Sequence, residues 1–483
     1  MKFTLRNLFL IILFAGILYL TLIPISDPDF WWHLRTGQLI AQTFTIPHTD
    51  PFSFTNFGKP WITHEWLTEL FIFLLYRLGS YGLLIIAFGL IITFAFFFTY
   101  LRCPSESKPY VAGFVLFLGM IMSFPIFGVR PQMISLLLTS IFLFLLDRYK
   151  KTGKLRFILF LPVIILLWVN LHAGYFLGLV VLAIYIFADL IEWLVSRFYK
   201  NDSLFSPSWK SLVPLTCILF LCLFATLINP NGYKLLIYPF QTLTDPVMQQ
   251  YIQEWQSPDF HSMIMLPFAV MILALIGFGL TGKRRISFTN ILLILAFGYE
   301  ALHSIRNIPI FALVAIPVLA EQISSWVKIQ STSKISKPMK WVFPILVIGI
   351  AVLLVHDFIR VNNSQTETVT ENFPQGAVNW ILTNKPQGQI FNYYNWGGYL
   401  IWRLYPEYLV YIDGRADVYG DEFLLSYANI STNANWEQFL DHQNIHLVII
   451  DPTSNLANVL RQSPDWKISF KDKISVIFTK IND

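Results

Sequence analysis

The sequence has 483 residues, of which 55% are hydrophobic and only 13% are charged, and its formal net charge is +5. Soluble domains carry about 25% charged residues, so this composition excludes an ordinary soluble enzyme and a disordered scaffold. The basic residues form no stripe with interleaved aromatic residues, which excludes a nucleic-acid partner. A polytopic membrane protein, surrounded by lipid, remains.

Apolar stretches long enough to cross a bilayer recur from the N-terminus to about residue 356. We predict eleven spans, at residues 8–25, 81–101, 110–125, 131–147, 157–172, 174–195, 211–228, 262–280, 288–303, 308–326 and 341–356. The first span follows Lys2 and Arg6 and lacks a small-x-small cleavage site, so we expect an uncleaved anchor.

The distribution of lysine and arginine predicts the orientation of these spans. With the N-terminus in the cytoplasm, the predicted inner segments hold 19 of these residues and the predicted outer segments between spans hold 6. This agrees with the positive-inside rule. We therefore expect an integral protein of the plasma or inner membrane, with residues 26–80, residues 229–261 and the C-terminal region on the extracytoplasmic side.

The composition becomes more polar after residue 357. We expect a transmembrane domain at 1–357, a linker at 358–372 and a small extracytoplasmic α/β domain at 373–483. Within that domain the patterns predict helices at 377–383, 398–404 and 436–442, strands at 389–392, 408–412 and 446–450, and a terminal hairpin formed by 467–470 and 474–479.

The predicted first outer loop, residues 26–80, is dense in acidic and histidine side chains. It contains Asp27, Asp29, Asp50 and Glu65 together with His33, His48 and His64. Two carboxylates flanking Pro28 can bind a divalent cation through hard oxygen ligands, and one of them can take a proton from an acceptor hydroxyl. Alternatively, Asp27 or Asp29 caps a helix that begins near Phe30.

The segment Asp27-Pro28-Asp29-Phe30-Trp31-Trp32-His33-Leu34-Arg35-Thr36-Gly37 resembles the first outer loop of GT-C glycosyltransferases. These multi-span enzymes use polyprenyl-phosphate-linked sugar donors, and the pattern is most similar to that of oligosaccharyltransferase catalytic subunits. Protein mannosyltransferases and lipid A aminoarabinose transferases share the general plan. The resemblance implies a mainly α, GT-C-like membrane helix bundle. It also implies that Asp27 is the catalytic or metal-binding carboxylate, with Asp29 and Asp50 as partners and Mg²⁺ or Mn²⁺ as the cation.

A second similarity to oligosaccharyltransferases lies in the C-terminal region, at residues 389–400 and 412–419. Those enzymes carry an acidic residue in the loop after the strand, where this chain has Asn395 and Trp396. Recognition of a peptide acceptor therefore does not follow from the resemblance. The segment Asp413-Gly414-Arg415-Ala416-Asp417 fits an acceptor-contacting loop or an internal ion pair beside a turn.

Further candidates for substrate binding are charged or hydrogen-bonding groups at the predicted outer ends of spans. An arginine presents a fork suited to phosphate, whereas pairing with Glu300 or snorkelling is the alternative. His172, at the end of the fifth span, suits either a sugar or an interhelical hydrogen bond. The full predicted substrate-binding set is His33, Arg35, His48, His64, Glu65, Arg130, His172, Glu254 and Arg306.

Together these features predict a membrane glycosyltransferase that moves a sugar, with inversion, from a polyprenyl-phosphate-linked donor to an extracytoplasmic glycan, lipid or protein acceptor. P-loop and GxGxxG motifs are absent from the sequence, so we expect no nucleotide cofactor. The alternatives are a lipid or saccharide transporter or flippase, and a non-catalytic cell-envelope assembly protein. A transporter would place charged or broken segments near the bilayer midplane, whereas polarity here gathers at the outer ends of the spans.

Overall fold

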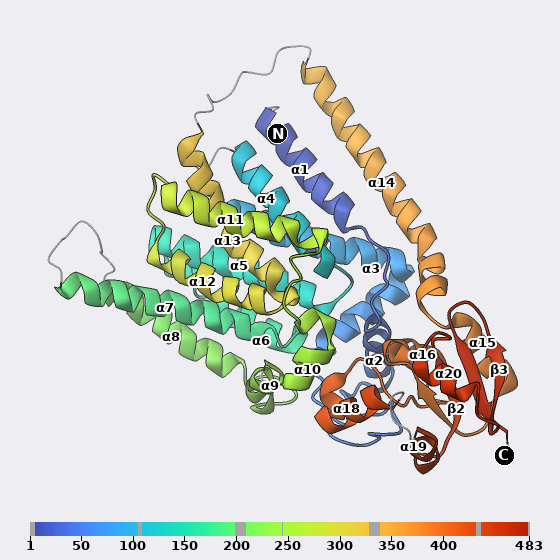
Figure 1. Ribbon diagram of the computed structural model, residues 1–483. Helices are drawn as coiled ribbons and strands as arrows, with labels where there is room; N and C mark the ends of the chain where they lie inside the picture. Colours follow the sequence, from blue (N-terminus) through green and yellow to red (C-terminus); the bar gives the residue numbers. More distant parts are fainter. Residues whose placement is uncertain are drawn as a thin grey trace. The chain divides into compact units, whose positions relative to one another are not determined.

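A computed structural model describes residues 5–104, 109–198, 209–243, 245–327, 339–430 and 436–481. The chain forms two compact units, which are described separately (Figure 1). Unit 1 comprises Met1–Ile23, Ile85–Pro239 and Ile252–Val361. Unit 2 comprises Pro24–Leu84, Phe240–Tyr251 and Asn362–Asp483.

All eleven predicted spans coincide with apolar helices. Seven are long and apolar enough to cross a membrane: Trp66–Arg102 (α3), Pro109–Ile126 (α4 and η1), Pro131–Thr152 (α5), Tyr175–Ser196 (in α7), Met263–Thr281 (η4 and α11), Ile305–Trp326 (η5 and α13) and Val342–Asn372 (in α14). The other four are shorter: Leu5–Thr21 (α1), Leu155–Leu171 (η2 and α6), Leu212–Ala225 (in α8) and Phe288–His303 (α12). The mainly helical membrane fold is confirmed, and the orientation stays a prediction.

Helix α13 (Ile308–Trp326) is the core of unit 1. Every residue from Ile308 to Ala320 is buried, as expected for a helix that is apolar on all sides and surrounded by other helices. It packs against α4, α11 and α12. Gly119 in α4 allows a close approach, because a Cβ there would lie 2.4 Å from the Ile316 side chain. The sequence of α13 therefore organises the helices around it.

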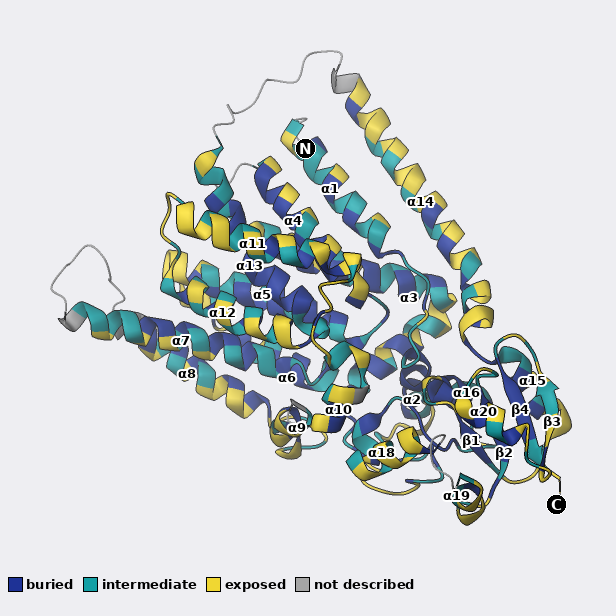
Figure 2. Ribbon diagram, in the orientation of Figure 1, coloured by how far each residue is buried: buried dark blue, intermediate teal, exposed yellow. Residues whose placement is uncertain are grey.

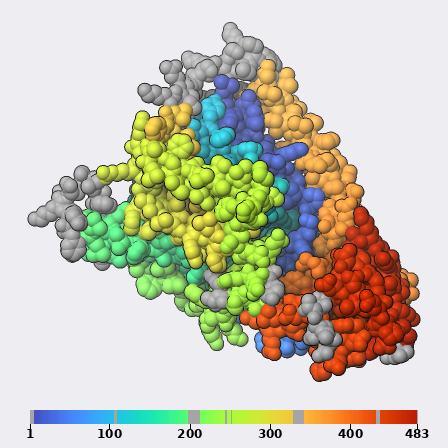
Figure 3. Space-filling view, in the orientation of Figure 1, coloured from blue at the N-terminus to red at the C-terminus, as the bar shows by residue number. Residues whose placement is uncertain are grey.

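Large apolar side chains also lie on the outside of unit 1. On α14 (Met339–Asn372) they include Ile345, Ile348 and Leu353, and on α11 they include Leu273 and Leu280. Figure 2 shows the exposed residues along α14, and its atoms lie on the surface in Figure 3. Soluble proteins rarely expose apolar patches this extensive, whereas lipid accepts them. This surface supports the assignment to the membrane.

Unit 2 contains a four-stranded sheet with strand order β1-β2-β4-β3 (Figure 1). Its strands are β1 (Gln389–Asn392), β2 (Ile445–Ile450), β3 (Trp466–Lys471) and β4 (Val476–Lys480). β1 and β2 are parallel, and the other two pairings are antiparallel. Unit 2 contains the start of α3, up to Leu84, and the end of α14, from Asn362. The α-helices that lie wholly within it are α2 (Phe30–Thr43), α10 (Pro246–Tyr251), α15 (Gln375–Asn384), α16 (Gly397–Leu404), α17 (Ala416–Tyr419), α18 (Asp421–Asn429), α19 (Trp436–His442) and α20 (Asn455–Leu460).

Most of the elements predicted for residues 373–483 are confirmed, including β1, β2, α15, α16, α19 and the β3–β4 hairpin. The predicted strand at 408–412 is wrong, because only Val410 pairs there, in an isolated bridge with Ser53. The residues expected to form a linker, 358–372, continue α14 as a helix. The side-chain amide of Gln365 in that helix exchanges two hydrogen bonds with the backbone of Ile25, at 2.7 and 2.9 Å.

The first loop belongs to unit 2, although we expected it within the transmembrane domain. Backbone hydrogen bonds join Phe54 N–H to the Val410 carbonyl, and Val410 N–H to the Phe52 carbonyl, both at 3.1 Å. The Thr55 hydroxyl donates to the Tyr411 carbonyl at 2.8 Å. Because these groups pair with each other, the loop and the C-terminal region fold as one body.

Candidate functional site

The acidic turn before α2 holds two of the predicted catalytic carboxylates. Asp27 Oδ1 accepts a hydrogen bond from the Asp29 backbone N–H at 3.0 Å, which closes the turn. Within the described part of the chain the Asp29 side chain makes no capping hydrogen bond to α2, and its Oδ1 instead accepts from the Trp32 indole at 3.1 Å. The alternative that the Asp29 side chain caps α2 is therefore not realised.

The Asp29 carboxylate lies against the loop that follows Asp413. A Cβ on Gly414 would be 1.8 Å from Asp29 Oδ1, so only glycine permits this approach. Tyr394 donates a long hydrogen bond of 3.4 Å to the Gly414 carbonyl. Burial raises the pKa of Tyr394, and the negative charges of Asp29, Asp413 and Asp417 raise it further. The acidic turn and the loop after Asp413 thus bring several carboxylates close to Tyr394 in unit 2.

A second group of titratable residues lies where α2 meets the start of α3. His33 Nδ1 is 3.4 Å from Glu65 Oε2 and 3.4 Å from Glu69 Oε1. His64 Nε2 is 3.3 Å from Glu65 Oε1. One atom from each of His33, Glu65 and Glu69 lies within 4.8 Å of the others, so these three residues could hold a metal ion. We call this set the His33 cluster.

Electrostatic interactions favour the protonated form of His33 in this cluster and of the neighbouring His64. Burial alone would lower the pKa of His33, but Glu65, Glu69 and, more weakly, Asp29 outweigh burial and raise it. For His64 burial likewise opposes the charge, yet Glu65 and then Asp417 raise the pKa to about 9. This shift favours the protonated form of His64. A protonated, half-buried imidazole can donate a charge-assisted hydrogen bond to an anionic substrate group.

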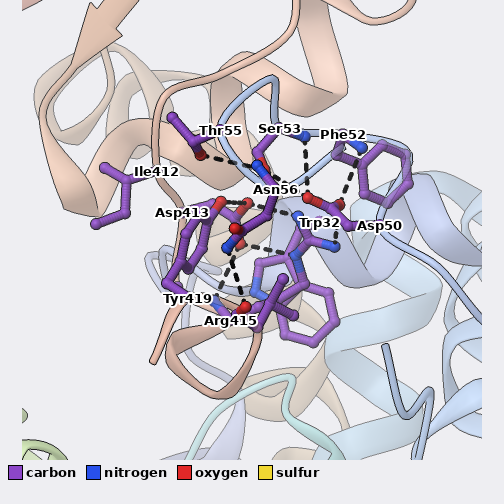
Figure 4. A network of polar contacts seen from close by, with 12 residues as sticks. Trp32, Asp50, Phe52, Ser53, Thr55, Asn56, Ile412, Asp413, Arg415 and Tyr419 are labelled. Carbon is purple, nitrogen blue, oxygen red and sulfur yellow. Dashed lines mark hydrogen bonds and ion pairs between the residues drawn. The ribbon is translucent and has the colours of Figure 1, made fainter. Parts of the chain in front are cut away.

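Asp50 lies in a buried ion-pair network with Arg415 (Figure 4). Arg415 Nη1 is 2.8 Å from Asp50 Oδ1, and Arg415 Nη2 is 2.7 Å from Asp413 Oδ2. Tyr419 donates to Asp413 Oδ2 at 2.6 Å, and Asp50 also accepts from the Ser53 hydroxyl and from backbone N–H groups. These contacts give Asp50 the position of a structural anchor between the loop and the C-terminal region.

The guanidinium of Arg415 is sandwiched as well as paired. Its central carbon lies 4.6 Å from the Trp61 ring centroid and 5.1 Å from that of Phe52. Burial alone would raise the pKa of Asp413, but Arg415 and the Tyr419 hydroxyl outweigh burial and hold this pKa below its ordinary value. Of the two alternatives for the Asp413–Asp417 segment, the internal ion pair is thus present for Asp413 and Arg415.

The remaining predicted residues of the first loop have different surroundings. Arg35 donates to the Tyr405 carbonyl and to Gln38 Oε1, both at 2.6 Å, and lies over the Tyr405 ring. Burial lowers the pKa of Arg35. His48 is exposed, and its backbone carbonyl accepts from Trp61 N–H at 2.8 Å. These contacts place Arg35 in the packing of α2 against the C-terminal region.

A hollow of about 560 Å³ in unit 2 lies between α2, α3 and α16. Its lining includes Gln38 and Gln42 from α2, Tyr76 and Arg77 from α3, and Trp402 from α16. The Tyr76 and Trp402 rings meet edge to face, with centroids 5.8 Å apart. A few polar groups set among aromatic surfaces are typical of small-molecule sites.

Three predicted residues gather within unit 1. Arg130, just before α5, forms an ion pair with Glu254 in η3 (Gln253–Trp255). Arg306 in η5 (Ile305–Asn307) lies over the Trp255 ring, 4.5 Å from its centroid. The Ser304 hydroxyl ties the two segments together by donating to the Glu254 carbonyl at 2.8 Å. Arg130 is therefore paired with Glu254 and not with the expected Glu300, and phosphate binding by these residues stays a prediction.

His172 joins helices of unit 1 through a hydrogen-bond chain. The Trp168 indole donates to the Ser135 hydroxyl at 2.7 Å, and Ser135 is 2.7 Å from His172 Nδ1. This is the interhelical bonding that was the alternative to sugar binding. The sequence analysis did not identify Glu69. The available signal was its position four residues after Glu65, which directly precedes α3, because groups spaced by four residues at the start of a helix lie close together.

Comparison with known proteins identifies the fold. No protein-family model and no curated protein matches the sequence. Among solved structures, the apo oligosaccharyltransferase of Archaeoglobus fulgidus matches at 14% identity with a TM-score of 0.53, over 92% of this chain and 69% of the other. ArnT from Cupriavidus metallidurans, bound to undecaprenyl phosphate, matches at 12% identity with a TM-score of 0.51, over 98% of both chains. The chain has the GT-C fold.

A third match is to a longer protein. Arabinofuranosyltransferase AftD from Mycobacteria matches all of this chain at 13% identity with a TM-score of 0.55. The present chain spans only 40% of AftD's length. The expected resemblance to GT-C glycosyltransferases is thus confirmed at the level of fold, by structures whose sequences differ at most positions.

Proposed function

We propose that this protein is a membrane glycosyltransferase that moves a sugar from a polyprenyl-phosphate-linked donor to an extracytoplasmic acceptor. The GT-C fold supports this proposal, as does the binding of undecaprenyl phosphate by ArnT, which matches over 98% of this chain. The observation that carries the proposal is the acidic turn. Unit 2 places Asp29 against the Gly414 loop, where its charge acts on both His33 and Tyr394.

In this mechanism the Asp27–Asp29 turn supplies the general base. A carboxylate takes the proton from an acceptor hydroxyl as the hydroxyl oxygen forms a bond to the anomeric carbon. The bond from that carbon to the phosphate oxygen breaks, and its electron pair leaves with the phosphate. Because attack and departure are in line, the anomeric configuration inverts. The resemblance implies Asp27 as the base, whereas the contacts of Asp29 with Trp32 and Gly414 favour Asp29.

The leaving phosphate needs positive charge, and unit 2 offers two sources. Against the effect of burial, Glu65 and Asp417 raise the pKa of His64 to about 9, which favours the protonated form of His64 while Glu65 is paired with it. Arg77 lines the hollow beside α2 together with Tyr76 and Trp402. Fixed cations aimed at developing negative charge are commonly the largest rate contribution in such sites. We therefore propose His64 and Arg77 as phosphate-binding residues.

The test is a transfer assay with purified full-length protein, using labelled polyprenyl-phosphate sugars and extracted envelope acceptors. General-base catalysis contributes about 10²–10⁴-fold, so Asp27→Asn or Asp29→Asn should reduce transfer by at least about 100-fold. The variant that loses more identifies the base. Asp441→Asn is the matched control, because Asp441 is an exposed carboxylate paired with Lys480.

Three outcomes contradict the proposal. Unchanged transfer in both turn variants would remove these carboxylates from the chemistry. Translocation of a labelled lipid in vesicles without turnover would identify a transporter. Absence of both activities across the donor panel would identify a non-catalytic assembly protein.

A further inference from the structure

We propose that the His33 cluster is a binding site for a divalent transition-metal ion, with His33, Glu65 and Glu69 as ligands. This set differs from Asp27, Asp29 and Asp50, the metal ligands expected from the sequence. The binding proposal does not depend on the transferase activity.

The backbone brings the three ligands together before any ion binds. Glu65 precedes α3 and Glu69 lies in its first turn, where the Glu69 N–H donates to the Glu65 carbonyl at 3.0 Å. His33 and Gly37 are one turn apart on α2. A Cβ on Gly37 would lie 2.0 Å from the Glu69 carbonyl oxygen, so this glycine lets α2 approach the start of α3. That contact holds Glu69 beside His33.

The spacing of the ligand atoms matches a metal site. Ligands about 2.0–2.1 Å from a tetrahedral zinc ion lie about 3.3–3.4 Å apart. His33 Nδ1 is 3.4 Å from one oxygen of Glu65 and 3.4 Å from one oxygen of Glu69. Two of the three ligand separations thus already equal those of a tetrahedral centre, and the third is no more than 4.8 Å.

Burial provides the second and independent observation. His33, Glu65 and Glu69 are 4%, 6% and 1% exposed. Glu69 Oε2 is buried and finds no hydrogen-bond partner among the described residues. A buried carboxylate oxygen without a partner loses its hydration and gains nothing in return. The 3.4 Å separation from His33 concerns Glu69 Oε1, so a cation bound by both oxygens of this carboxylate would also give Oε2 its missing partner.

The donor set indicates which ion binds. Ca²⁺ and Mg²⁺ prefer ligands that are all oxygen, whereas an imidazole nitrogen with two carboxylates suits Zn²⁺ and its neighbours in the first transition row. Three protein ligands leave a fourth position open, as in catalytic zinc sites. A polarising role toward the leaving phosphate follows only if the proposed transferase function holds. The competing occupant of the cluster is a proton on His33.

Metal analysis of the full-length protein, purified without chelator or affinity metal, tests this site directly. We expect about one equivalent of zinc per chain, or of another first-row ion, and its removal by EDTA. Adding zinc chloride alone should restore the equivalent and raise the apparent melting temperature of the stripped protein. Cobalt should give the visible absorption of a low-symmetry, four-coordinate site.

Two variants connect the metal to its ligands. Glu69→Gln keeps the side-chain shape and should weaken zinc binding by at least about tenfold, and His33→Ala should do the same. His442→Ala and Glu437→Gln, exposed residues of unit 2, are the controls and should keep the metal. If a cluster variant fails to fold, the metal content and the zinc-dependent melting shift of the unaltered protein still decide.

Protein that contains no first-row metal and shows no melting shift with zinc overturns the proposal, and the cluster is then a proton-bridged ion pair. Equal zinc affinity in Glu69→Gln and the controls would overturn it as well. Transfer activity that survives complete removal of the metal would contradict the polarising role alone. Failure of the proposed transferase function would leave the metal content unchanged, so the two failures are distinguishable.

Discussion

Replacing Arg415 with methionine should destabilise unit 2 more than any exposed charge substitution. Arg415 is 2% exposed and pairs with Asp50 and Asp413, which are themselves 1% and 0% exposed. Methionine keeps much of the apolar contact with Phe52 and Trp61 but leaves two buried carboxylates without a cation. Breaking one buried pair in this way costs about 3–5 kcal/mol.

That cost corresponds to a fall of about 6–20 °C in the apparent melting temperature, at 2–4 °C per kcal/mol for a body of this size. The assay is thermal unfolding of the purified protein, in which cleavage of the first loop by a protease reports the unfolding of unit 2. Lys480→Met is the matched control. It breaks the exposed Lys480–Asp441 pair, which should contribute about 0–1 kcal/mol.

A compensating variant isolates the cause. Combining Arg415→Met with Asp50→Asn and Asp413→Asn removes both unpaired charges and should recover much of the lost stability, because neutral or apolar replacements of a whole buried charge network are often tolerated. If Arg415→Met melts no lower than Lys480→Met, or if the triple variant is less stable than Arg415→Met, the ion-pair argument is refuted.

Three further predictions concern pH, the glycine contact and orientation. The folded-state pKa of Asp413 is depressed, so its contribution to the stability of the fold is present above the unfolded pKa of about 3.9 and is lost as pH falls through the folded value. In Arg415→Met the buried carboxylates lack a cation and should favour protonation, so mild acid should stabilise that variant. Melting curves between pH 7 and 4 will test this. Gly414→Ala should displace the Asp29 carboxylate and reduce transfer by about 100-fold with little change in melting temperature, whereas retained transfer would remove this contact from the site. A cysteine at Thr45 should react with an impermeant reagent in intact cells and one at Arg285 only after permeabilisation; the opposite pattern would reverse the predicted topology.

The spans and the sheet could be predicted from the sequence because their signals are local. The alternation and β-branched residues of β2, and the apolar runs of the helices, lie within short windows. The strand predicted at 408–412 has the same local signal, yet its pairing depends on Ser53, far away in the chain. The polar segment at 358–372 resembles a linker, but its helix is anchored by Gln365 on Ile25.

The candidate site was only partly predictable for the same reason. Asp27 and Asp29 are conspicuous because they share one short motif. Glu69 lies within the predicted first outer loop, but its partner His33 is 36 positions away, so no short motif marks it. The partnership of Asp50 with Arg415 joins residues separated by most of the chain, and a single sequence contains no signal for it.

The hydrogen bonds from Thr55 to Tyr411 and from Asn56 to Val418 connect residues 356 and 362 positions apart. During synthesis, the early segment must therefore wait until nearly the whole polypeptide has emerged before it can complete its structure. Contacts of such long sequence separation form slowly, and the unpartnered segment is vulnerable in the meantime. A ribosome that stops before Val410 would release a chain that lacks Val410, Tyr411 and Val418, the residues with which the first loop forms its backbone-directed hydrogen bonds.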